Sequence, residues 1–87
     1  MKYILFEDDK TGLKEPVIFG DHTTHSQVMV ERAHPVSAGY FMIDNDGIVS
    51  TYGDAPSLGL KPEDGDATLI YYVLQNMGTV YFLDFDR

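Results

Sequence analysis

All three histidines of the chain lie in one short stretch, FGDHTTHSQVMVERAH, at residues 19–34. His22 and His25 are three residues apart, so on a helix they would share a face. Asp21 or His34 could then complete a set of nitrogen and oxygen ligands for zinc or iron. However, Asp-His-Thr-Thr is also typical of the start of a helix, and His22 would then precede that helix. The sequence therefore favours a structural role, with no metal or cofactor. His22, His25 and Asp21 remain candidate metal ligands, and contact between the histidines and a partner is the other alternative.

Paired carboxylates are the second group that could carry a function. Asp44 and Asp46 are two residues apart, and so are Asp84 and Asp86. In an extended chain, at about 3.3 Å per residue, each pair would lie roughly 6.6 Å apart on one face. That spacing is close to the spacing of phosphates along a nucleic-acid strand, so these four residues are predicted to contact a partner. The alternative is that they keep the surface soluble and discourage pairing at sheet edges.

The overall charge indicates what kind of partner such carboxylates would meet. Fourteen acidic residues against six basic ones give a formal charge of −8. Direct binding to DNA or RNA draws its affinity from Lys and Arg, and an anionic membrane would repel this chain, so neither is expected. A basic protein is the electrostatically favourable partner.

Composition also narrows the class of protein. The 87 residues, 44% of them hydrophobic, suffice for one folded domain spanning residues 1–87. There is no cysteine, which excludes disulfides, thiolate nucleophiles and cysteine-based zinc sites. No serine nucleophile motif and no phosphate-binding glycine loop is present, so we do not expect an enzyme. No segment has the length and hydrophobicity of a signal peptide core or a membrane span, so a soluble, cytoplasmic protein is expected.

The helices and strands that would position these residues can be assigned from the hydrophobic pattern and from the turn-forming residues between the apolar runs. An Asp-Gly pair between two β-prone runs predicts a hairpin turning at residues 44–47. Pro62 and the acidic residues after it indicate the start of a helix. The sequence predicts strands at residues 2–6, 17–19, 36–43, 48–52 and 79–86, and helices at residues 25–33 and 67–77. This ββαββαβ order predicts a single α+β domain, a mostly antiparallel sheet with two helices on one face.

Three stretches of the chain, covering roughly residues 16–70, carry a resemblance. VIFGDHTTHSQV, PVSAGYFMI and YGDAPSLGLKPEDGDATLI resemble short orphan proteins of tailed bacteriophages and prophages, which have no assigned activity. Leu60 and Lys61 stand where Ser-Arg would be more typical of those proteins. The resemblance implies a small accessory protein made in the cytoplasm of a bacterial host.

Taken together, these features predict a small acidic protein of phage type that acts by binding a protein. The partner could be a host protein that itself binds nucleic acid or serves in defence. A structural protein that forms a homo-oligomer is one alternative, with Tyr40, Tyr52 or Phe82 buried in a symmetric contact. A metal protein built on the histidines and Asp21 is the other.

Overall fold

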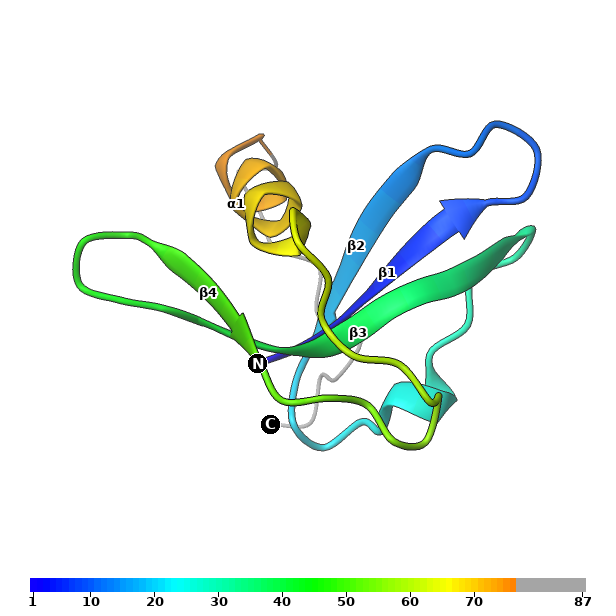
Figure 1. The fold of residues 1–87 in the computed structure, drawn as a ribbon, viewed down its shortest axis with the longest axis horizontal. Helices are drawn as coiled ribbons and strands as arrows, with labels where there is room; N and C mark the ends of the chain where they lie inside the picture. Colours follow the sequence, from blue (N-terminus) through cyan, green and yellow to red (C-terminus); the bar gives the residue numbers. More distant parts are fainter. Residues whose placement is uncertain (77–87) are drawn as a thin grey trace.

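The structure is a computed structural model that describes residues 1–76. Within these residues, four antiparallel strands form one sheet in the order β2-β1-β3-β4 (Figure 1). The elements are β1 (Lys2–Asp8), β2 (Lys14–Phe19), the single 3₁₀ turn η1 (His25–Gln27), β3 (Ala33–Ile43), β4 (Val49–Tyr52) and α1 (Asp66–Asn76). The strand predicted at residues 79–86 lies outside the described residues.

Strand β1 is central, and both of its faces are buried. Tyr3 faces the side on which α1 packs, where it belongs to a cluster with Ile18, Phe41 and Ile70. Ile4 faces the opposite side, which is covered by η1 and by the loop after β4 (Figure 1). Side chains alternate between the two faces of a strand, so a strand with both faces covered needs an unbroken apolar run. The run Tyr3–Phe6 supplies it, with every residue at most 5% exposed.

The predicted arrangement of two helices on one face is wrong. Among residues 1–76, α1 is the only α-helix, and the predicted helix at residues 25–33 is reduced to η1 on the other face of the sheet. The helix-start signal is real, since the Gln27 side-chain oxygen accepts a hydrogen bond from the Thr24 N–H at 2.8 Å. Arg32 then has a φ of 64°, which no helix accommodates, and Ala33 already pairs with β1. Pairing with the sheet outweighs a marginal, short helix.

The strand predicted at residues 36–43 begins earlier, at Ala33, so Pro35 lies inside β3. It lies opposite Phe6 at the point where the register between β1 and β3 shifts, so that Leu5 faces Ser37. At a bulge the ladder of hydrogen bonds between two strands is interrupted, so the missing N–H of a proline matters less there. This part of β3 also has no β4 residue on its other side. A proline is therefore tolerated in a strand that is otherwise internal.

The hairpin predicted at residues 44–47 is confirmed. Tyr40 lies opposite Tyr52 and Ile43 opposite Val49. The Asp44 N–H donates to the Ile48 carbonyl at 3.1 Å, and Gly47, with a φ of 81°, closes the turn. The arrangement is that of a three-residue hairpin loop with glycine in the left-handed region.

Replacing Gly47 by valine should therefore lower the free energy of unfolding by about 1–2 kcal/mol, because a β-branched residue is strained at this φ. A Cβ atom at this position would meet no atom within 4 Å, so the loss would come from backbone strain alone. Gly47→Asn is the matched control, since asparagine tolerates this region, and it should lose less. Equal urea midpoints for wild type and Gly47→Val would contradict this turn geometry.

After β4 the chain returns across the sheet to begin α1. The Ala38 N–H donates to the Lys61 carbonyl at 3.3 Å, so this segment lies along the part of β3 that β4 leaves unpaired. A Cβ atom on Gly39 would lie 2.7 Å from the Pro62 ring, which makes glycine necessary at this crossing. The crossing places residues 63–66 and the first turn of α1 over β1 and β3.

Candidate functional site

The three histidines do not converge. His25 is 4% exposed, its Nε2 lies 2.9 Å from the Gly39 carbonyl oxygen, and its ring packs edge-on against Phe19 and Tyr40. His34 is exposed, with Nδ1 2.7 Å from a carboxylate oxygen of Asp9. His22 lies on the surface before η1. Within residues 1–76 no three His, Cys, Asp or Glu side chains are grouped as a metal would require.

Asp21, the proposed oxygen ligand, is exposed and belongs to the anchor of the loop after β2. Its carboxylate lies 3.9 Å from the N-terminal amine, and its carbonyl accepts a hydrogen bond from the Lys2 ammonium. Lys2 also donates to the Thr23 carbonyl at 2.9 Å. These contacts hold the loop against the start of β1.

Asp44 and Asp46 lie in the hairpin loop and not in extended chain. One Asp44 oxygen accepts the backbone N–H groups of Asp46 and Ile48, at 2.8 and 3.0 Å. The spacing argument for an extended pair therefore does not apply to these two residues, although both remain exposed. Asp84, Asp86 and Phe82 lie outside the described residues.

The β3–β4 hairpin extends away from the rest of the domain (Figure 1). Its tip exposes three large apolar side chains, Met42 at 56%, Ile43 at 50% and Ile48 at 58%. Met42 and Ile43 are adjacent in a strand and so point to opposite faces, which leaves both faces of the tip open. Behind the tip, Tyr52 is half exposed and stacks on the more buried Tyr40. We call Met42, Ile43, Ile48, Asp44 and Asp46 the hairpin tip.

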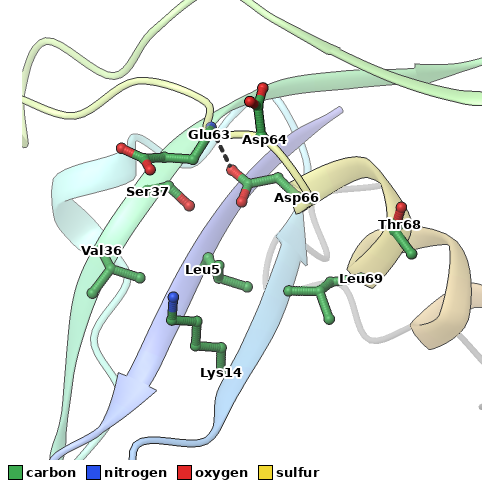
Figure 2. Close-up of a pocket in the computed structure, with 10 residues that line it drawn as sticks. Leu5, Lys14, Val36, Ser37, Glu63, Asp64, Asp66, Thr68 and Leu69 are labelled. Atoms are coloured by element: carbon green, nitrogen blue, oxygen red, sulfur yellow. Dashed lines mark hydrogen bonds between the residues drawn. The ribbon is translucent and has the colours of Figure 1, made fainter.

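A second feature, which the sequence did not reveal, is a buried polar cluster where α1 begins. Asp66 is 2% exposed, and its Oδ2 accepts hydrogen bonds from the Tyr3 hydroxyl at 2.5 Å and from the Glu63 N–H at 3.0 Å (Figure 2). Burial, followed by the bond to Asp66 and its charge, raises the pKa of Tyr3 well above its usual range. The Tyr3 hydroxyl therefore stays protonated as a donor.

The sequence pointed only to acidic residues near the positive end of a helix dipole, and Asp66 was one of three. Its partner Tyr3 lies 63 residues away in the chain, which no local pattern could indicate. Ser37, which lines the same region from β3, carried no signal at all.

Comparison of the chain with protein-family models, curated proteins and solved structures found no match in any of the three. Within residues 1–76, no helix combines the length and the hydrophobicity needed to cross a membrane.

Proposed function

We propose that this protein works by binding a protein partner through the hairpin tip. The observation that carries the proposal is the exposure of Met42, Ile43 and Ile48 together at the end of a projecting hairpin. Clustered exposed apolar side chains of this size are typical of interaction surfaces, and methionine is enriched at such surfaces. The apolar side chains would provide the contact area of the interface.

Charge supports a basic partner. No lysine or arginine lies between Arg32 and Lys61, whereas Asp44 and Asp46 flank the apolar residues of the tip. Within the net charge of −8 this hairpin is locally acidic, so it would attract a basic surface and orient the encounter. A symmetric contact between two tips would instead bring like charges together, so we favour a different protein over a second copy of this chain.

The resemblance to phage proteins is consistent with this role. A small binding protein made in a bacterial cytoplasm would meet host proteins, and a nucleic-acid-binding protein presents the basic surface that the tip would fit. We therefore propose a host protein as the partner, and a binding role rather than a catalytic one.

The test compares a variant of the tip with a control variant elsewhere on the surface, in a pull-down from bacterial lysate. Replacing Met42 and Ile48 by serine removes two of the three exposed apolar side chains of the tip, whereas the control Leu13→Ser removes one comparably exposed side chain, 65% accessible, from the loop between β1 and β2. We expect a protein that is retained by wild type and Leu13→Ser and is lost with the tip variant. Equal retention by all three proteins would contradict the proposal.

The purified partner then tests the role of charge. The association rate should fall by about tenfold or more between low salt and about 0.5 M, and the change should shrink in Asp44→Asn with Asp46→Asn. Asparagine keeps the side-chain oxygen that Asp44 uses in the turn. A salt-independent rate would remove the electrostatic part of the proposal. Light scattering that shows a dimer dispersed by the tip variant would favour self-assembly instead.

A further inference from the structure

A pocket of about 450 Å³ lies between the sheet and the start of α1 (Figure 2). None of the residues that line it belongs to the hairpin tip. Its apolar surface comes from Leu5 on β1, Val36 on β3 and Leu69 on α1. The polar groups around it are Lys14, Ser37, Glu63, Asp64, Asp66 and Thr68. This volume lies within the range of small-molecule sites. The lining has more polar than apolar side chains, so it fits a ligand that carries a charged or polar group together with a short apolar part.

Two of the polar groups are buried side chains with unused capacity to bind. Ser37 is 1% exposed, and its hydroxyl has no hydrogen-bond partner among the described residues. A buried hydroxyl without a hydrogen-bond partner destabilises the folded state, so its presence calls for an explanation. Asp66 uses one carboxylate oxygen for Tyr3 and Glu63, and its other oxygen is turned toward Leu5 and the side of the pocket from which the Ser37 hydroxyl projects (Figure 2).

We propose that this pocket binds an aliphatic ammonium group. The ammonium lies between the Asp66 carboxylate and the Ser37 hydroxyl, and its alkyl chain lies along the apolar surface of the pocket. An ammonium has three N–H donors and no acceptor, which matches a carboxylate oxygen beside a hydroxyl oxygen that can accept. Bonds of this kind that involve a charged group are the stronger ones.

The charges around the pocket indicate whether its ligand is a cation or an anion. The start of α1 contributes about half a positive charge, and Lys14 adds one more. Against these stand the three carboxylates of Glu63, Asp64 and Asp66. Asp66 is also the most buried of the charges and therefore the least screened, whereas Lys14 is exposed. The balance is negative, and the site favours a cation.

The ammonium could belong to a free alkylamine or to a lysine side chain of another protein, since the chemistry is shared. We therefore choose as probes n-butylammonium, the blocked amino acid Nα-acetyl-lysine methylamide, and n-butanoate. Titrations of the full chain, followed by NMR, report binding to the pocket through the resonances of β1, β3 and α1. We expect saturable binding of butylammonium and none of butanoate.

Ser37→Ala is the decisive variant because its effects on binding and on stability should have opposite signs. Removing an unpaired buried hydroxyl should leave the protein as stable as wild type or more stable. The same change should weaken butylammonium binding by about tenfold or more, because a hydrogen bond to a charged group is lost. Ser50→Ala, at an exposed position of β4, is the control and should change neither property.

Lys14→Met tests the sign of the ligand charge. Methionine keeps an unbranched apolar stem and removes the positive charge, so butylammonium should bind more tightly. Weaker binding in Lys14→Met, preference for butanoate, equal binding by wild type and Ser37→Ala, or no saturation by about 0.1 M probe would each overturn the proposal. Binding of the lysine derivative as tightly as butylammonium identifies a protein side chain as a sufficient source, and binding of the amine alone identifies a free small molecule.

Discussion

Asp66→Ala is expected to lower the free energy of unfolding by about 2–4 kcal/mol, a large share of the stability of a domain of this size. The change removes the carboxylate that accepts from the Tyr3 hydroxyl, in a fully buried side chain, and from the Glu63 N–H just before α1. The two lost hydrogen bonds, both to a charged group, contribute about 1–2 kcal/mol each. Urea unfolding followed by circular dichroism measures the loss.

Asp64→Ala is the matched control for this prediction. Asp64 lies in the same turn and carries the same charge, but it is exposed, so the variant should stay within about 0.5 kcal/mol of wild type. Tyr3→Phe removes the donor and leaves Asp66 with the Glu63 N–H, so its loss should be smaller than that of Asp66→Ala. If Asp64→Ala and Asp66→Ala cost the same, the effect is one of helix-dipole charge and not of the buried bond.

The same bond gives stability a dependence on alkaline pH. The folded protein raises the pKa of Tyr3, so the folded state favours the protonated hydroxyl. The stability from this group is therefore fully present below the unfolded tyrosine pKa of about 10, and is lost progressively as the pH rises above it. Wild type should lose more stability than Tyr3→Phe between pH 9 and about pH 11. Parallel curves would show that Tyr3 ionises equally in both states.

His25→Ala should cost about 2–4 kcal/mol, comparable to other large-to-small changes in a core. The change removes a buried ring that contacts Phe19 and Tyr40, with centroids 5.3 and 5.6 Å away, and a hydrogen-bonding group beside the Gly39 carbonyl. His34→Ala is the control, because an exposed pair such as His34 and Asp9 contributes at most about 1 kcal/mol.

Unfolding in the presence of a chelator tests whether His25 has this structural role or binds a metal. Wild type should unfold at the same urea concentration with and without EDTA, and purified protein should carry no stoichiometric zinc or iron. A wild-type midpoint that falls on chelation, together with a His25→Ala midpoint that does not respond, would show that the histidine holds a metal.

The parts of the fold that sequence predicted correctly are those in which local pattern and tertiary role agree. The hairpin at Asp44 was marked by a glycine able to take a positive φ, and that residue does so. α1 begins at Asp66, one residue before the predicted start, because Pro62 and the acidic turn fix its beginning. The first hairpin was found from its apolar runs, although β1 and β2 both extend further than predicted.

The predictions were wrong or incomplete where the local structure depends on contacts with a distant part of the chain. Thr24 and Gln27 form a capping interaction, but they cap a single turn because the chain leaves helical geometry and joins β1 at Ala33. No local pattern indicates that pairing, because the partner residues of β1 lie 25 residues or more earlier in the chain. Likewise the pocket joins Ser37 to Asp66 through the return of the chain over Gly39, which depends on the assembled sheet.

The central position of β1 also has a consequence for how fast the domain forms. Its hairpin with β2 closes a short loop, but β3 pairs with it across 25 residues or more, and Asp66 meets Tyr3 across 63 residues. Closing such loops costs entropy before the contacts compensate, and chains dominated by distant pairings fold slowly. We expect folding in milliseconds to seconds. Docking of α1 would come late, because its buried acceptor site has no partner until the sheet presents Tyr3.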